Sequence, residues 1–513
     1  MIFFLYLFQV LPNPNENNMP QIRFLFFFCF TACSVFWSVA QQKISLSLED
    51  VIAMAQDYSL DAMVAKNTYL GDYWSFRSHK AELLPSLNFS AGIANYDRSQ
   101  RALQDAETGE IRYRLNDNMS NSGTLSIDQN IALTGGTLSF SSSLERLDQY
   151  SPSRNITYST QPVTLRYLQP LWAYNSLKWD KEIEPKKFEQ AKIAYIESME
   201  DITIKATQLF FNLVLAQMRY GMAVNSHSNM KTMYEIASRR FRETGTVTQS
   251  ELLQLELRLT NDSLSIASQS KQYQASMMNL RSFLGYADQV EIELVPADEV
   301  PEMVLDYDFV IEKVLANSSF LMGQQITKLQ AERAVEQARG NRGISISLSA
   351  RFGLSNTDEQ FRAAYTDLMN YQVVGLSVRI PIMDWGMGKG RIQMAEAQKK
   401  TTLFKQEQAL NDYIQGIYLD VLEFNTQREQ LRMARYANEI AIQRYELTLK
   451  DFAAGTISVT DLNTAQSEKE SANVSYLSAM SNYWINYFNI RKLSVYDYIN
   501  HTDISAEFDK LIE

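Results

Sequence analysis

The chain has 513 residues, a net charge of −11 and an ordinary balance of 45% hydrophobic and 21% charged residues. An acidic chain without a basic cluster is poorly suited to nucleic-acid binding. Its two cysteines, Cys29 and Cys33, lie in an N-terminal apolar run, and its three histidines, His79, His227 and His501, are far apart. We therefore expect no disulfide framework, no metal site and no cofactor.

The N-terminus has the pattern of a secretory signal. Arg23 precedes the apolar run FLFFFCFTACSVFW, and the SVA triplet at 38–40 offers small residues to a signal peptidase. We expect 1–40 to be a signal region. Within it, translation would start at Met19 and cleavage would follow Ala40. A lipoprotein acylated at Cys33 is the alternative. Beyond the signal no stretch approaches the roughly 20 apolar residues of a membrane-spanning helix, so membrane insertion would require strands.

Two later segments share a pattern of alternation that ends at a proline. VTLRYLQPLW (163–172) alternates apolar residues up to Pro170, and VGLSVRIPIMDWG (374–386) does so up to Pro381. Proline lacks the amide donor that a sheet ladder needs, so each proline is expected to end a strand.

The correspondence continues downstream at an offset of 210 residues. ETGTVTQSELL then aligns with AAGTISVTDLN, and each contains a Gly-Thr turn followed by an acidic residue. The aligned residues are Gly245, Thr246 and Glu251 in the first copy and Gly455, Thr456 and Asp461 in the second. One offset over some 80 residues predicts a tandem duplication.

The duplication divides the mature chain. We expect a first repeat at 41–295, with a helix, β-strands including an extra hairpin, a very long helix and a further helix. A linker at 296–302 precedes the second repeat at 303–495, and 496–513 form a C-terminal tail.

Each repeat is predicted to contain a helix of about 65–70 residues, roughly 100 Å long. No proline lies between Trp385 and Phe452, and Leu403, Leu410 and Ile417 begin a heptad series. Shorter helices are expected at about 48–83, 247–285, 303–340 and 458–494. A cytosolic coiled coil would account for the heptads but not for the strands.

The strands alternate apolar and polar residues. ISISLSARFGL (344–354) has Ile, Leu and Phe on one face and Ser and Arg on the other, and 125–133 and 137–144 also alternate. We expect 98–160 to contain a β-hairpin around Thr134–Gly136. The alternation fits a barrel wall between lipid and water, with a soluble β-sandwich as the alternative.

Two further features favour a membrane barrel over a soluble sandwich. Trp172 and Trp385 stand just beyond the two prolines, where an interfacial aromatic girdle would lie. Four or six strands cannot close a membrane barrel alone, and open edges cannot face lipid. A barrel would therefore have to be shared between subunits.

Five segments in this order resemble the TolC-like outer-membrane efflux proteins, or outer membrane factors, over nearly all of 44–495. They are LSLEDVIAMAQDYSLDA (46–62), LLPSLNFSA (83–91), QPLW (169–172), IPIMDWG (380–386) and GTISVTDLNTAQ (455–466). The resemblance implies a mixed α and β membrane protein: a homotrimer with a transmembrane β-barrel and a long coiled-coil helical barrel, built from two tandem repeats per chain.

The resemblance also implies a function. Such proteins are passive exit ducts of tripartite efflux or type I secretion systems, placed in outer-membrane lipid and extending into the periplasm. Their partners are a periplasmic adaptor and an inner-membrane pump of the RND or ABC type, and they are not enzymes. The sequence does not indicate the cargo.

The family's narrow end lies at the helical turns farthest from the membrane, where acidic residues ring the channel. Asp461 aligns with the first ring aspartate, whereas Thr464 replaces the second. Phe452 stands in place of a linking tyrosine and Ile457 in place of a linking arginine, so the ring is thinner and its closed-state links differ. Asp461 could alternatively serve only as charge at a helix N-terminus.

The resemblance gives the remaining turn residues a role in adaptor docking. These are Gly245, Thr246 and Glu251 at one tip and Gly455 and Thr456 at the other, with Glu251 expected on the outer layer. A trimeric outer-membrane stalk or adhesin without a transport lumen is the alternative function. A secreted hydrolase is a weaker one, because no nucleophile, histidine and acid are grouped.

Overall fold

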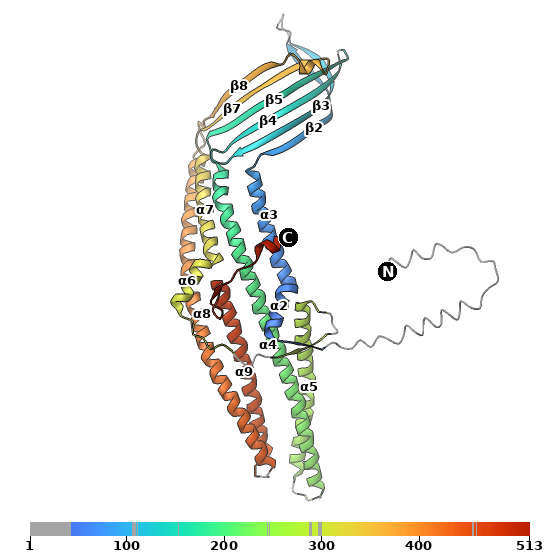
Figure 1. Ribbon diagram of the computed structural model, residues 1–513, viewed down its shortest axis with the longest axis vertical. Coiled ribbons are helices and arrows are strands. Elements are labelled where there is room, and N and C mark those ends of the chain that lie inside the picture. Colours follow the sequence, from blue (N-terminus) through green and yellow to red (C-terminus); the bar gives the residue numbers. More distant parts are fainter. Residues whose placement is uncertain are drawn as a thin grey trace, which may run out of the picture.

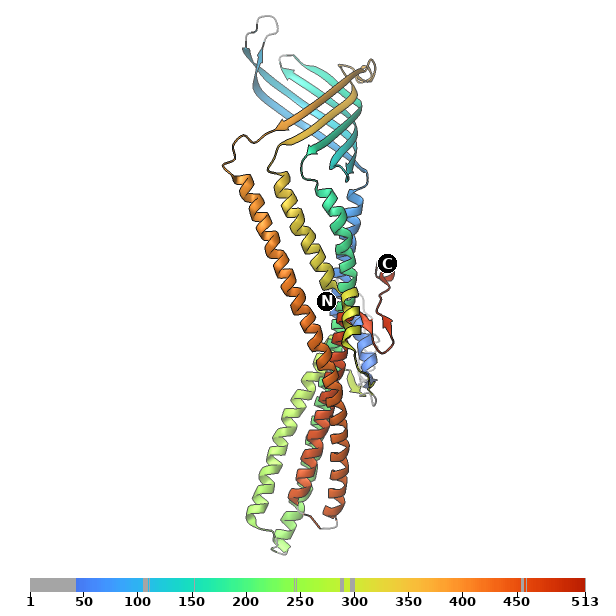
Figure 2. The same ribbon diagram turned by 90° about the vertical axis from the view of Figure 1, so that its left-hand side faces the viewer.

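A computed structural model describes residues 43–104, 109, 111–151, 153–243, 245, 247–286, 290–295, 300–453, 456–457 and 459–512. The molecule is elongated, with one curved sheet at one end and long paired helices reaching the other (Figures 1 and 2). The expected signal region, 1–40, lies outside the described residues.

The sheet has six antiparallel strands in the order β2-β3-β4-β5-β7-β8. They are β2 (Ser86–Gln104), β3 (Ile111–Ile131), β4 (Gly136–Ser151), β5 (Asn155–Trp172), β7 (Ser345–Asp358) and β8 (Met369–Arg379). Ile131 pairs with Gly136 across a turn in which Gly135 has a φ of 72°. The hairpin predicted around Thr134–Gly136 is thus confirmed. Gly135 suits its turn because glycine adopts this left-handed backbone without a steric penalty.

Two helices have the predicted rod length. They are α4 (Ser176–Glu243, 68 residues) and α8 (Met387–Ala453, 67 residues). Each pairs with a 36-residue helix beyond its tip, α5 (Gln249–Leu284) or α9 (Val459–Ser494). The two tips lie at the same end of the molecule, opposite the sheet (Figure 1).

The single helices predicted at 48–83 and 303–340 are wrong in one respect, because each is broken at a serine. Ser59 separates α2 (Leu48–Tyr58) from α3 (Leu60–Glu82), and Ser318 separates α6 (Tyr307–Asn317) from α7 (Ser319–Gly340). Both serines have extended backbone and cap the following helix, accepting the N–H of Ala62 at 3.1 Å and of Phe320 at 3.2 Å. A serine that caps the next helix ends the previous one, although the apolar pattern continues across it.

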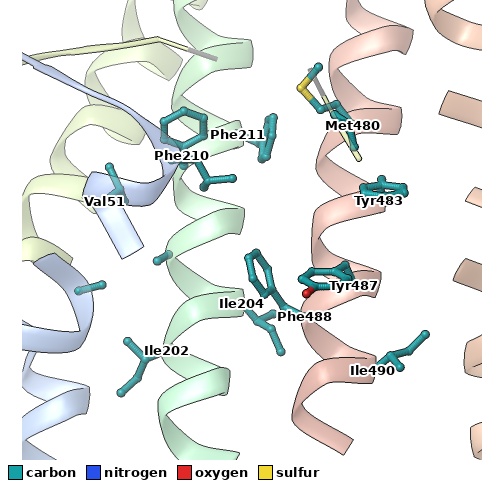
Figure 3. Packing of buried hydrophobic residues seen from close by; sticks show 14 of the residues in the cluster. Val51, Ile202, Ile204, Phe210, Phe211, Met480, Tyr483, Tyr487, Phe488 and Ile490 are labelled. Atoms are coloured by element: carbon teal, nitrogen blue, oxygen red, sulfur yellow. The ribbon is translucent and has the colours of Figure 1, made fainter. Parts of the chain in front are cut away.

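Most of the buried apolar residues lie midway along the molecule, where the helices of the two halves meet. Phe210 and Phe211 of α4 and Met480, Tyr483 and Tyr487 of α9 belong to one buried cluster, in which Phe211 points toward α9 and Phe210 lies on the side of α4 near Val51 (Figure 3). All five are at most 1% exposed. We call this region the waist. It fixes the two helical hairpins to each other.

The waist is flanked by short elements that the sequence analysis did not predict. β1 (Lys43–Leu46) pairs in parallel with β6 (Glu291–Leu294), which follows α5. Near the C-terminus β9 (Tyr496–Asp497) pairs with β10 (Thr502–Asp503), and α10 (Phe508–Ile512) follows. The C-terminal tail is therefore folded onto the helices (Figure 1).

Within the described ranges, none of the helices is long and apolar enough to cross a membrane. The mixed α and β fold class is confirmed by these elements. The tandem duplication, the linker at 296–302 and the other boundaries stay predictions.

Candidate functional site

One face of the sheet is an apolar band. Cross-strand pairs put the large apolar side chains together, as in Leu165 opposite Phe352 and Ile346 opposite Val378. Its most exposed members are Leu87, Phe89, Leu125, Ile127, Phe140, Val163, Leu165, Phe352, Val374, Leu376 and Val378. On β7 the band runs over 346–354, about 30 Å at 3.3 Å per residue, which is close to the apolar height of a membrane barrel.

The opposite face of the same strands is mostly polar. Its residues alternate with those of the apolar band and pair with one another across the strands. They include Ser86, Asn88, Ser126, Asp128, Ser139, Ser141, Thr164, Arg166, Ser347, Ser349, Arg351 and Ser377. A sheet with one apolar and one polar face separates lipid from water.

The two outer strands of the sheet are β2 and β8, and each pairs with one neighbour only. An unpaired strand edge exposes backbone N–H and C=O groups, which cannot be left unsatisfied in lipid. In lipid, both edges would therefore need a pairing strand, which the described residues of this chain do not supply.

The first expected strand break, Pro170, is misplaced by two residues. β5 continues through Pro170, which lies opposite Ser347, to Trp172. The register shifts between Pro170 and Trp172, so the proline stands at a bulge, one of the few strand positions that tolerates a missing donor.

The second break, at Pro381, follows the end of β8 at Arg379 as predicted. Beyond it the chain turns into α8 through Trp385 and Gly386, with φ values of 52° and 84°. The Asp384 carboxylate accepts the N–H groups of Gly388 and Gly386 at 2.9 Å each, and these bonds hold its pKa below the usual value. Asp384 thereby caps the long helix α8.

The first helical tip is a short turn. Gly245 has a φ of 62°, and its N–H donates to the Arg240 carbonyl at 3.0 Å, whereas Thr246 lies outside the described residues. Glu251 belongs to a capping box: it accepts the N–H and hydroxyl of Thr248 at 2.7 and 2.9 Å. The hydrogen bond from the Thr248 N–H lowers the pKa of Glu251.

The second tip, like the first, has a backbone hydrogen bond to a carbonyl five residues earlier. Thr456 donates its N–H and hydroxyl to the Asp451 carbonyl at 3.1 and 2.8 Å, whereas Gly455 lies outside the described residues. Phe452 falls in the last turn of α8, and its side chain also lies outside the described part of the chain.

The residues expected at the aperture follow this turn. Asp461 lies in the first turn of α9 and is exposed. Thr464 is exposed one turn later and bonds back to the Thr460 carbonyl at 2.9 Å. The start of α9, which contains both residues, lies at the end of the molecule farthest from the sheet (Figure 1).

Two contacts that the sequence analysis missed join α8 to α9 above this tip. Arg444 forms an ion pair with Glu468, and the Lys469 ammonium lies 4.3 Å from the ring centre of Tyr445. We call these four residues the tip clasp. Opposite charges facing each other across a predicted helical hairpin were the signal that could have revealed it.

The waist contains a buried ion network, also missed. Arg491 of α9 donates to both oxygens of Glu200 on α4, at 2.7 and 2.9 Å, and Glu200 is 2% exposed. Asp497 lies 3.4 Å from Arg491 and accepts the Tyr487 hydroxyl at 2.8 Å. Beside this network Lys492 pairs with Asp201 at 2.7 Å.

Burial competes with pairing in the electrostatics of the network. It raises the pKa of Glu200 even though Arg491 opposes the shift. Burial would also raise the pKa of Asp497, but hydrogen bonds led by that from Asn500 hold it below its usual value. The charges are thus paired within the fold and act as a structural joint.

Comparison with known proteins agrees with this geometry. A sequence model of the family described as outer membrane efflux protein matches residues 310–494. No curated protein sequence matches the chain. The predicted resemblance to the TolC-like outer-membrane efflux proteins is confirmed by this match and by the shared fold.

Solved structures with the same fold cover nearly the whole chain. The CmeC outer membrane channel of Campylobacter jejuni has a TM-score of 0.63 and 16% identity, covering 98% of this chain and 96% of its own. The outer membrane protein VceC of Vibrio cholerae has a TM-score of 0.58 and 12% identity, covering 87% of this chain and 95% of its own. The MtrE outer membrane channel of Neisseria gonorrhoeae has a TM-score of 0.55 and 14% identity, covering 87% of this chain and 88% of its own.

Proposed function

We propose that this chain is one protomer of a homotrimeric outer-membrane channel, the passive exit duct of a tripartite efflux or type I secretion system. Substrates would be delivered by an inner-membrane pump of the RND or ABC type through a periplasmic adaptor. The proposal is for a transport protein rather than an enzyme.

The observation that carries this proposal is the two-faced sheet with open edges. Its apolar band is suited to lipid, its polar face to water, and β2 and β8 need partners. Three copies of a six-stranded sheet would supply 18 strands, a number found in barrels with an aqueous channel. The long helices that continue from the sheet would then line a tube through the periplasm.

The tips are proposed to form the periplasmic end of this tube. Asp461, with Thr464 and Phe452 nearby, would ring the aperture. The adaptor would dock on the tip turns at Gly245, Thr246, Glu251, Gly455 and Thr456. The exposure of Glu251 and Asp461 and the position of both tips support this assignment.

Cysteine cross-linking tests the shared barrel, because both natural cysteines lie in the expected signal. We would place one cysteine at Ser90 on β2 and one at Gly375 or Ser377 on β8, all on the polar face. Oxidation in membranes should give covalent dimers and trimers for at least one combination.

A cysteine at Ser141 on the central strand β4, combined with the one at Ser90, is the matched control and should remain monomeric. The purified protein should also conduct ions in planar bilayers. A monodisperse monomer that conducts nothing would refute the channel, and a cross-linked trimer without conductance would indicate a stalk or adhesin.

A further inference from the structure

We propose that the polar face of the sheet carries an anion-binding site, formed by Arg166 of β5 and Arg351 of β7. It would bind carboxylate or phosphate groups of cargo leaving through the channel. The inference rests on the proposed function, because it requires the polar face to line a water-filled lumen.

The two arginines are direct cross-strand neighbours. Arg166 lies opposite Arg351 in the β5–β7 register, and both are exposed. Side chains so placed have Cβ atoms about 4.5–5.5 Å apart, and like charges in this arrangement destabilise a sheet. The pair therefore adds nothing to the stability of the sheet unless an anion occupies it.

The pair has no counter-ion among the residues that the structure describes. Across the residues that the structure describes, neither guanidinium forms a hydrogen bond or an ion pair. Asp128 shares their cross-strand row but is two strands from Arg166, with Ser139 between them, or about 9.6 Å at the usual strand spacing. Asp128 already accepts hydrogen bonds from Asn88 at 3.1 Å and Ser126 at 2.8 Å.

The height of the pair in the sheet decides which solvent it meets. Leu165 and Phe352, the chain neighbours of the arginines, lie within the apolar band on the other face. The arginines are thus at membrane height, where a charged side chain must face water rather than lipid. In a closed barrel that water fills the lumen.

Polar groups fix the wall beside the pair. Thr164, two residues before Arg166, is 5% exposed, and its hydroxyl lies 2.9 Å from that of Tyr371. Tyr371 also donates to Gln161 at 3.2 Å and packs against Gly353, where a Cβ would come within 2.8 Å of its ring. This packed wall holds both strands in register, so the arginines stay adjacent.

Adjacent guanidinium groups match a particular chemistry. Each presents a planar fork of N–H donors that binds two oxygens of a carboxylate or phosphate. The other same-face neighbours of the pair are the uncharged Ser139, Leu168, Ser349 and Val373. An entering anion therefore meets two cations and no nearby carboxylate.

Block by inorganic pyrophosphate in planar bilayers tests the site. Pyrophosphate added on the sheet side should reduce the conductance of the wild-type channel. The Arg166→Ser/Arg351→Ser channel should need at least about tenfold more pyrophosphate for half block, the loss expected for a charge-assisted contact. Arg166→Lys/Arg351→Lys, which keeps the charge without the forks, should fall between the two.

Arg379→Ser is the matched control, because Arg379 is exposed on the same face opposite Ser345 and faces no second arginine. Its block should stay within about twofold of wild type. The inference is overturned if the double serine channel conducts normally but keeps wild-type block, or if Arg379→Ser weakens block equally. A wild-type protein that forms no conducting channel would instead refute the proposed function.

Discussion

The waist and the tips are built from the same four long helices but are held together in different ways. At the waist α4 and α9 share buried aromatic residues and the buried pair of Glu200 with Arg491. At the second tip α8 and α9 are joined by the tip clasp, in which Arg444 and Glu468 are 55% and 45% exposed. Exposed ion pairs contribute about 0–1 kcal/mol, far less than a packed core.

This difference has a mechanical consequence. About 43 residues of α4 separate Glu200 from its end at Glu243, roughly 65 Å of helix at 1.5 Å per residue. A small rotation at the waist therefore becomes a large displacement at the tips. The fold combines a fixed joint with weakly held ends, an arrangement that would let the proposed aperture open without unfolding.

The largest expected effect comes from breaking the buried pair at the waist. Glu200→Ala leaves Arg491 buried without its main partner, so the free energy of unfolding should fall by about 3 kcal/mol. Urea unfolding of the detergent-solubilised protein, followed by helical circular dichroism, measures this loss.

Two variants control this test. Glu200→Leu/Arg491→Leu removes both charges and should recover most of the lost stability, because apolar residues can replace a buried pair. Lys492→Ala breaks the neighbouring, more exposed pair with Asp201 and should cost less than about 1 kcal/mol. Equal losses for Glu200→Ala and Lys492→Ala would show that burial is not what distinguishes the waist.

The next effect concerns the C-terminal tail, which closes the waist from outside. The Phe508 ring lies 5.3 Å from that of Tyr69 on α3 and 6.2 Å from that of Tyr195 on α4. Phe508→Ala should cost about 2 kcal/mol, less than a fully buried phenylalanine, because the ring is half-buried. Faster proteolysis of the tail together with a lower urea midpoint would verify the contact.

Lys510→Ala, which breaks only an exposed pair with Glu507, is the control. It should change neither the rate of tail proteolysis nor the urea midpoint. A tail that is cleaved no faster in Phe508→Ala would mean that the aromatic contact does not hold it.

The waist also shows where prediction from sequence ends. Heptad spacing predicts α4 and α8, because helix periodicity is local. Glu200 and Arg491 are 291 positions apart, and only the folded arrangement of α4 against α9 brings them together. Likewise, Arg166 faces Arg351 only because β5 and β7 are neighbours in the sheet. The local sequence of either strand does not reveal that they are neighbours.

The tips were more accessible to sequence analysis than the waist. The Gly-Thr turns and the acidic residues after them predicted two helical turns, and Thr248 and Glu251 have the spacing of a capping box. The breaks at Ser59 and Ser318 were missed because the apolar pattern runs across them. In these cases a cap outweighed continued periodicity.

A smaller effect is expected from loosening the first tip. Thr248→Ala removes the N-cap of α5 and should cost about 1 kcal/mol of local helix stability. Amide hydrogen exchange should then speed up in the first turns of α5 and stay unchanged at the waist. Ser250→Ala, an exposed change inside the same turn, is the control.

The same cap should respond to pH. The pKa of Glu251 is lowered in the fold from an ordinary value of 4.5, so its contribution is present above pH 4.5 and is lost as the pH falls through the folded pKa. The protection factors of the amides at this tip, corrected for the intrinsic pH dependence of exchange, should therefore fall in acid for the wild type and much less for Thr248→Ala. Equal acid responses in both proteins would argue against the capping box as the cause.

The smallest effect on stability, with a large one on transport, is expected at the second tip. Asp461 lies in the first turn of α9, where negative charge is favourable for the helix, but three copies around a trimer axis would also attract cations. Asp461→Ala should lower cation preference and weaken block by divalent cations in planar bilayers, while expression and trimer formation stay normal. Glu251→Ala removes the aligned acid of the first tip and should change conductance little but weaken adaptor docking. If Asp461→Ala leaves selectivity and divalent block untouched, the aspartate serves the helix terminus alone and the constriction lies elsewhere on the tip.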